Sequence, residues 1–190
     1  LLKNGADPNQ RFDDRMGTFP LMIAAWRNCV ETARVLLHFR ADPNQVPQFV
    51  GSDFSDFFVF VQELLGRHGG AALFCAAQQE SFELARLLLD NGADVNKRLS
   101  TSTLGDWPLA AAARYSRNSS AVVELLIERK ADLNLCNEQG ESALQIAMSN
   151  GNCDVASVIG RALAPIAPPA PFPFFDAEAL GREPTRQKLE

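Results

Sequence analysis

The chain has 190 residues, of which 46% are hydrophobic and 22% are charged, as is typical of a folded domain with a buried core. Its formal net charge of −5 argues against a general binder of nucleic acid or anionic membranes, because such proteins carry a basic excess. No apolar run reaches the roughly 18 residues that a membrane-spanning helix needs.

Cysteine and histidine are too sparse for a metal site or a disulfide framework. The sequence has two histidines, and none of its four cysteines forms a Cys-x-x-Cys pair. We therefore expect no metal, no cofactor and a reducing compartment. The first residue is Leu1 rather than methionine, so we expect a fragment of a longer protein.

Four segments in chain order repeat one apolar pattern and predict one short helix each. They occupy residues 17–25, 69–77, 105–113 and 140–148. In the first segment, Leu21, Ala24 and Ala25 stand at positions i, i+3 and i+4, the spacing of an apolar stripe along a helix. The small residues of these stripes let a neighbouring helix approach closely, so we expect the four helices to pack together.

A second apolar block follows each of these segments and predicts a longer helix. The blocks lie at residues 35–37, 87–89, 125–127 and 158–159. Gly92 follows the second block where a left-handed helix end is needed, and Asp94 and Asn96 suit a tight turn. Helix pairs this short cannot bury their own apolar faces, so neighbouring pairs must stack. Ala-Asp-x-Asn turns recur at residues 6–9, 41–44, 93–96 and 131–134.

These two recurring blocks resemble the ankyrin repeat. Residues 87–96, Leu-Leu-Leu-Asp-Asn-Gly-Ala-Asp-Val-Asn, match the family's second block throughout, and the Thr-Pro-Leu-His-x-Ala-Ala block is recognisable. The resemblance covers residues 1–163 and implies an all-α solenoid of stacked helix-turn-helix repeats with short hairpin turns. It implies about four complete repeats after a partial N-terminal one. With the free cysteines, it also implies a cytoplasmic or nuclear protein.

The sequence departs from the family pattern at both ends of its helices. The threonine that caps the first helix of a repeat is replaced by Phe19, Ala71 and Trp107, and only Ser142 retains a capping side chain. Arg40 and Lys130 replace the glycine that ends the second helix. Each replacement costs about 1 kcal/mol if the backbone stays left-handed. We therefore expect an array less stable than an idealised one.

Two segments lie outside the repeat pattern. Ala76 follows Ala24 by 52 residues instead of the family's period of about 33, so residues 45–68 form an insertion. A cap at Ser52 or Asp53 predicts an extra helix over residues 53–65. Residues 164–190 are a proline- and phenylalanine-rich linker with a weakly structured tail. This linker is either an SH3-type ligand or a cover for the last repeat through Phe172, Phe174 and Phe175.

The sequence favours binding over catalysis. No nucleophile, base or phosphate-binding pattern is recognisable, and His38 is expected to be a solvated helix residue. The resemblance implies a non-catalytic module that binds a partner protein through its concave groove and turn tips. The alternative is a regulatory segment of a larger enzyme or channel that contacts another domain of its own chain. The family's contact positions correspond here to Arg15, Met16, Thr18, Trp26, Arg27, Arg67, His68, Gln78, Gln79, Asp106, Arg114, Tyr115, Glu138, Glu141, Ser149 and Asn150.

The charges at these positions predict the chemistry of the partner. Four arginines fall in the first three repeats, whereas Glu138 and Glu141 fall in the last. We expect an acidic or phosphorylated protein segment as the partner and no nucleic acid. The turn asparagine Asn96 also resembles sites of asparaginyl hydroxylation in ankyrin turns, since Leu88 lies eight residues before it. The alternative for Asn96 is a purely structural turn residue.

The insertion generates a testable prediction. A helix over residues 53–65 places Phe54, Phe57, Phe58, Val61, Leu64 and Leu65 on one face, which either packs on the array or docks a partner. Replacing Phe57 and Phe58 with alanine should lower the free energy of unfolding, because a buried phenylalanine contributes roughly 1.5–3 kcal/mol. Urea unfolding and partner binding are the measurements. Lost binding at unchanged stability identifies a docking patch, and no change in either contradicts the helix.

Overall fold

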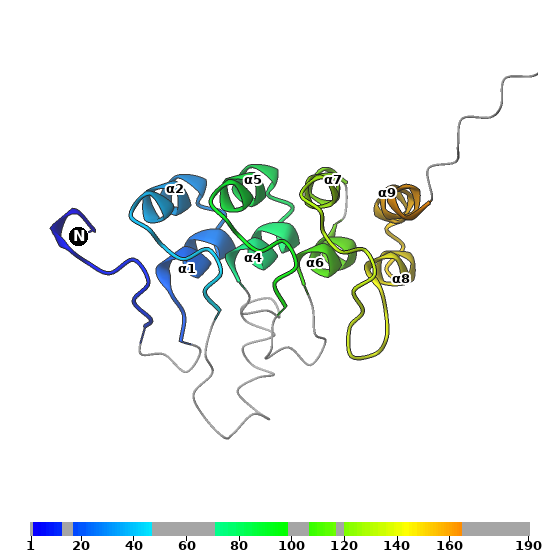
Figure 1. Cartoon of the computed structure of the whole chain (residues 1–190), viewed down its shortest axis with the longest axis horizontal. Helices are drawn as coiled ribbons and strands as arrows, with labels where there is room; N and C mark the ends of the chain where they lie inside the picture. Colours follow the sequence, from blue (N-terminus) through cyan, green and yellow to red (C-terminus); the bar gives the residue numbers. More distant parts are fainter. Residues whose placement is uncertain (1, 13–16, 47–70, 99–106, 117–119, 165–190) are drawn as a thin grey trace, which may run out of the picture.

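The computed structural model describes residues 2–12, 17–46, 71–98, 107–116 and 120–164 (Figure 1). Within these ranges lie a short 3-10 helix, Leu2–Asn4, and eight α-helices, without any extended strand. The insertion from residue 47 onward, with its predicted helix 53–65, lies outside the described residues, as do residues 165–190 of the tail. Both remain predictions.

The eight α-helices form four antiparallel pairs that stack side by side (Figure 1). Inner helices α1, α4, α6 and α8 make one row, and outer helices α2, α5, α7 and α9 make the other (Figure 1). The predicted all-α solenoid is therefore confirmed. The inner helices are Pro20–Trp26, Ala72–Gln78, Pro108–Tyr115 and Ala143–Ser149, and the outer helices are Val30–His38, Phe82–Asp90, Ala121–Glu128 and Cys153–Leu163.

Small side chains allow the inner helices to pack closely. Ala25, Ala77 and Ala113 occupy the same position in successive repeats, and all three are completely buried. In α4 every residue except Gln78 is buried, as expected for a helix that is apolar on all sides. The core is therefore one continuous layer that runs through all four repeats, because each helix buries part of the apolar surface of its neighbour.

The first inner helices begin with buried apolar residues in place of polar caps. Phe19, Ala71 and Trp107 precede α1, α4 and α6, and no side chain caps these three helices. Among the described helices only α8 has a capping box: Ser142 Oγ accepts from the Gln145 backbone N–H at 3.4 Å, and Gln145 Oε1 accepts from the Ser142 backbone N–H at 2.8 Å. The prediction that Ser142 alone caps is confirmed. The other three repeats lose a hydrogen bond and gain core burial.

Two basic residues adopt the left-handed backbone conformation that glycine favours. Arg40 and Lys130 have φ values of 66° and 65°, at the position where Gly92 has 87°. Their backbone N–H groups bond to Leu37 O and Ile127 O, so the helix ends still close. Because a side chain is strained at positive φ, the predicted cost of replacing glycine here applies to both repeats.

Lys130 provides a stability test. Replacing Lys130 with glycine should raise the free energy of unfolding by about 1 kcal/mol, because glycine adopts positive φ without strain. Urea denaturation measures this change. Glu128→Gly is the matched control: Glu128 is exposed in the last turn of α7, so glycine there should lower stability. A Lys130→Gly protein that is less stable than the parent would contradict the strain argument.

Candidate partner-binding surface

The last residues of the inner helices form a row along the array. Because α1, α4, α6 and α8 contact one another in that order, equivalent positions at their C-terminal ends repeat along the same edge. Half of the predicted contact positions fall here. We call this set the helix-end row: Trp26, Arg27, Gln78, Gln79, Arg114, Tyr115, Ser149 and Asn150.

The first repeat presents an aromatic ring and a cation together. The guanidinium carbon of Arg27 lies 5.5 Å from the ring centroid of Trp26, within cation–π range. The Trp26 side chain packs partly against the core, whereas Arg27 is exposed. Packing against the core fixes the ring, and the ring in turn holds the guanidinium at the surface. Tryptophan and arginine are the residue types most enriched in binding hot spots.

In the middle of the row the side chains are less exposed. Gln79 is exposed, while Gln78, Arg114 and Tyr115 are partly buried. Arg114 stands in the last turn of α6, where the helix dipole favours a positive charge. A stabilising role within its own helix therefore accounts for part of what Arg114 does.

In the last repeat the polar side chains are already bound to the protein itself. Ser149 Oγ donates to the backbone carbonyl of Ile146 at 3.0 Å, and Asn150 Nδ2 donates to the same carbonyl at 2.7 Å. These bonds add to the backbone bond from the Asn150 N–H to the same carbonyl at the C-terminal end of α8. Ser149 and Asn150 thus have less free hydrogen-bonding capacity for a partner than their exposure suggests.

One turn tip is fully described, between α7 and α8. Cys136 pairs with Ser142 in an antiparallel bridge, and buried Asn137 holds the loop because its Oδ1 accepts from the backbone N–H groups of Gln139 and Glu141. Glu141 is partly buried, and its Oε2 accepts from Asn137 Nδ2 at 2.9 Å. Glu138 is exposed, so it is the acidic group of this tip that is free to meet a partner.

The remaining predicted contact positions divide into two groups. Thr18 is described, but only 9% of it is exposed, so little of its side chain reaches the surface. The other five lie outside the described residues and remain predictions: Arg15, Met16, Arg67, His68 and Asp106.

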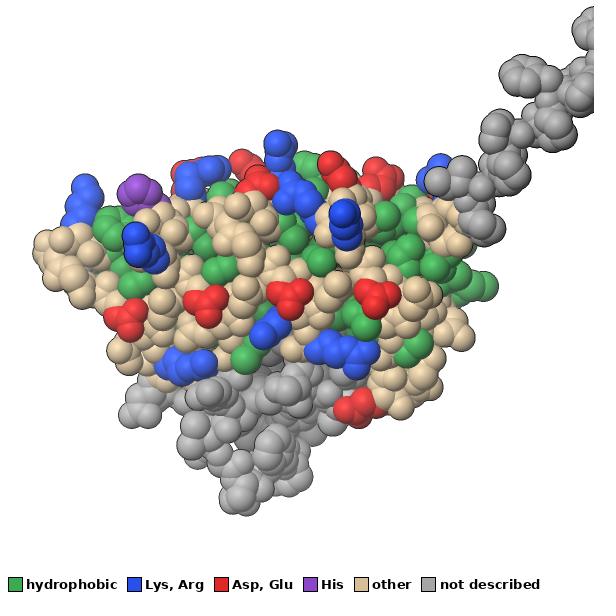
Figure 2. All heavy atoms as spheres, viewed as in Figure 1, with side chains coloured by type: hydrophobic (Ala, Val, Ile, Leu, Met, Phe, Trp, Pro, Cys, Tyr) green, Lys and Arg blue, Asp and Glu red, His purple; other side chains and the backbone are tan. Residues whose placement is uncertain are grey.

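A line of asparagines bridges each turn to the next, a feature that the sequence analysis missed. Oδ1 of Asn9, Asn44 and Asn96 accepts from the backbone N–H of Asp42, Asp94 and Asp132 at 2.7, 2.7 and 2.8 Å. The Asp-x-Asn recurrence was the available signal. Each Asp Oδ1 in turn accepts the backbone N–H of the asparagine two residues later, which shapes the turn. The aspartates of these turns consequently place acidic side chains at intervals along the side of the array where the turns lie (Figure 2).

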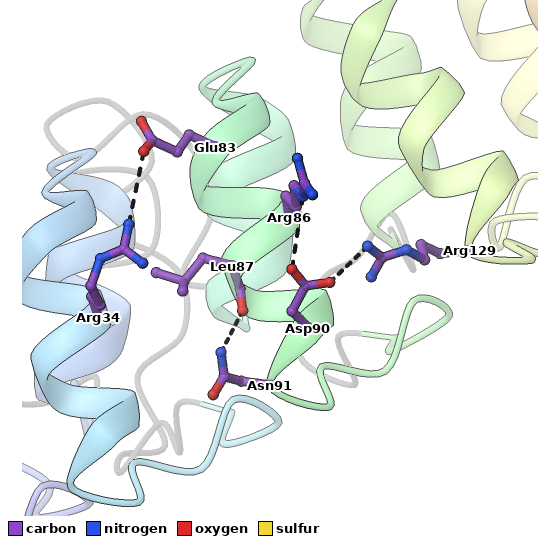
Figure 3. Close-up of polar contacts among 7 residues, drawn as sticks. All are labelled: Arg34, Glu83, Arg86, Leu87, Asp90, Asn91 and Arg129. Atoms are coloured by element: carbon purple, nitrogen blue, oxygen red, sulfur yellow. Dashed lines mark hydrogen bonds and ion pairs between the residues drawn. The ribbon is translucent and has the colours of Figure 1, made fainter.

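Ion pairs join the outer helices across repeats. Figure 3 shows Asp90 of α5 between Arg86 and Arg129. Arg129 Nη2 lies 2.7 Å from Asp90 Oδ1. Arg34 of α2 reaches Glu83 of α5 at 3.8 Å. Such exposed pairs contribute about 0–1 kcal/mol each. Six charged residues of this outer surface are therefore paired with one another, unlike Arg27.

Two further features of the described residues concern metal binding and membrane crossing. None of their His, Cys, Asp and Glu side chains form a group of three or more that could hold a metal ion. No helix among them has the length and apolar character needed to cross a membrane.

Comparison with known proteins identifies repeats along most of the chain. A family model of ankyrin repeats in three copies matches residues 73–161, and a single ankyrin-repeat model matches residues 16–46. The Xenopus laevis neurogenic locus notch homolog protein 1 is 32% identical over 146 residues, which is 77% of this chain and 5% of the relative.

Two further relatives are of other kinds. The Arabidopsis thaliana E3 ubiquitin-protein ligase KEG is 36% identical over 81 residues, 43% of this chain and 5% of the relative. The human transient receptor potential cation channel subfamily A member 1 is 26% identical over 134 residues, 70% of this chain and 11% of the relative. The chain thus spans only a small part of the length of the curated relatives it matches.

Asn96 generates a prediction about modification. If a hydroxylase accepts this turn, mass spectrometry of the protein purified from its own cells should find one added oxygen atom on the Asn96 peptide. Asn44 is the internal comparison, because its turn has the same Asp-x-Asn form with Pro43 in place of Val95. Absence of the modified peptide would leave Asn96 with the structural role that its bond to Asp132 already provides.

Proposed function

Because the chain belongs to the ankyrin-repeat family, we propose that it is a non-catalytic module that holds a partner protein, in the cytoplasm or the nucleus. The partner lies against the helix-end row and the turn tips beside it. The observation that carries this proposal is the Trp26–Arg27 pair, a ring supported by the core with an exposed cation over it. Such a pair offers contact area and charge at little cost in conformational entropy.

The partner in this proposal is an acidic or phosphorylated segment. Arg27 is exposed at the first repeat, and Arg114 extends the positive charge to the third. Exposed Glu138 stands at the other end of the surface and disfavours an acidic residue there. Opposite charges at the two ends give the bound segment one preferred direction, because charge complementarity sets orientation more than affinity.

A second candidate function is regulation of a larger protein that contains this array. The coverage of the relatives supports it, since the matched region is a small part of a ubiquitin ligase and of a cation channel. In that arrangement the partner segment belongs to another domain of the same polypeptide. Co-purification of the array with separately expressed flanking domains distinguishes this case from a partner in trans.

The charge of the partner is testable without knowing its identity. Random peptides displayed on phage and selected on the immobilised chain should be enriched in Asp and Glu, and their binding should weaken as salt rises. Arg27→Glu should weaken the selected peptides by about fivefold or more, as a hot spot of at least 1 kcal/mol implies. Fluorescence anisotropy measures both effects.

Arg161→Glu is the matched control for this test. Arg161 is exposed on α9, away from the helix-end row, and the substitution changes the net charge by the same amount. Peptide binding should therefore survive it. Selected peptides without acidic residues, or equal binding by the Arg27→Glu protein, would contradict the proposed surface.

A further inference from the structure

The last inner helix exposes positions that every earlier inner helix buries. Leu144 occupies the position of Leu21, Leu73 and Leu109, which are at most 1% exposed, yet Leu144 itself is partly exposed. Met148 occupies the position of the fully buried Ala25, Ala77 and Ala113, and 66% of it is exposed. In the earlier repeats the next inner helix packs against the one before it. Here no described helix follows.

The last outer helix repeats this arrangement. Ala156 occupies the position of Ala33, Ala85 and Val123, which are fully buried, but is itself partly exposed. Gly160 and Leu163 follow at i+4 and i+7 on the same side of α9. A Cβ built on Gly160 would meet nothing within 4 Å, and Leu163 is exposed. We call Leu144, Met148, Ala156, Gly160 and Leu163 the C-terminal end face.

The C-terminal end face is apolar, so we expect another segment or molecule to cover it. Its five residues carry no charge, whereas Asp154 and Arg161 of α9 line a separate depression beside α7. Terminal repeats of solenoids normally carry a polar outer face for solubility, and contiguous apolar patches usually mark contact surfaces. Figure 2 shows hydrophobic side chains gathered at the end of the array that carries α9.

We propose that the aromatic segment of the same chain, residues 170–175, packs on the C-terminal end face and serves as its cap. The segment reads Ala-Pro-Phe-Pro-Phe-Phe, and it follows directly after α9 in the sequence. Its three phenylalanines are Phe172, Phe174 and Phe175. Met148 offers a sulfur atom and a flexible side chain, which suit contact with aromatic rings.

The intervening chain has the required length. Phe172 lies eight positions after Ala164, the last described residue. In the extended conformation that proline-rich sequences favour, eight residues span about 25 Å at ~3.1 Å each. The end face comprises two helices that are each about 10 Å across, so its width is roughly 20 Å. Phe172 therefore reaches any part of it.

The tether favours this segment over a second copy of the chain. A short linker holds the phenylalanines at an effective concentration in the millimolar range. A second molecule at micromolar concentration competes poorly with a tethered segment whose effective concentration is millimolar. Prolines also limit the freedom that the segment loses when it docks, which lowers the entropic cost of ordering it.

Oxidation of Met148 tests the proposal in the full chain. Dilute hydrogen peroxide converts exposed methionine to its sulfoxide, and peptide mass spectrometry follows each methionine separately. Met148 should oxidise several-fold more slowly in the parent than in a Phe172→Ser, Phe174→Ser, Phe175→Ser protein. The triple variant should also melt at a lower temperature. Buried Met22 is the internal reference for folding, and Leu180→Ser is the matched tail control.

Every outcome decides for or against the aromatic cap. Slow oxidation of Met148 in the parent and in the Leu180→Ser protein, with fast oxidation in the triple variant, supports it. Equal rates in parent and triple variant overturn it, even if the melting temperature falls. Protection that rises with protein concentration and survives the triple substitution identifies a second copy as the cover and also overturns it. Because the helix-end row is untouched, these results are independent of the peptide-binding test.

Discussion

The structure depends on one constraint: a pair of helices of seven to eleven residues cannot bury its own apolar faces. Each pair therefore needs a neighbour, and the stability of the array is shared across the contacts between repeats. Fully buried Ala25, Ala77 and Ala113 show how this need is met, since only small side chains let the inner helices approach closely enough. Substitution of polar caps by Phe19 and Trp107 follows from the same constraint, because core burial replaces a local hydrogen bond.

Polar contacts set the spacing and direction of the stack. Hydrophobic contact is not directional, so it does not by itself define how one repeat is oriented on the next. The asparagine bridges between turns are directional, and they repeat from Asn9 to Asp42, Asn44 to Asp94 and Asn96 to Asp132. On the opposite layer, Asp90 and Arg129 join α5 to α7. The apolar core supplies most of the driving force, and these contacts hold the repeats in a common orientation.

The repeats share one backbone structure, and they differ in the side chains that they expose at equivalent positions. The same position along the helix-end row carries Arg27 in the first repeat and Asn150 in the last, where the side-chain amide already donates to the carbonyl of Ile146. The ends of the array differ from its middle for a further reason. Helix positions that are buried between repeats inside the stack are exposed in the last repeat, as at Met148. A repeat protein thus has two classes of surface, one along the array and one at its end.

The sequence by itself determined the number of repeats, the helix pairs and the capping role of Ser142, and it identified Arg40 and Lys130 as the residues at the glycine position of two helix ends. These features depend on apolar spacing and local backbone preference, which are properties of short stretches of chain. Only the tertiary structure decided that Thr18 is buried and that Asn44 bonds to the next turn. Each of these outcomes depends on which atoms of distant or neighbouring segments come within hydrogen-bonding or van der Waals distance. A one-dimensional pattern identifies equivalent positions, but it does not contain their surroundings, and those surroundings separate an exposed contact residue from a structural one.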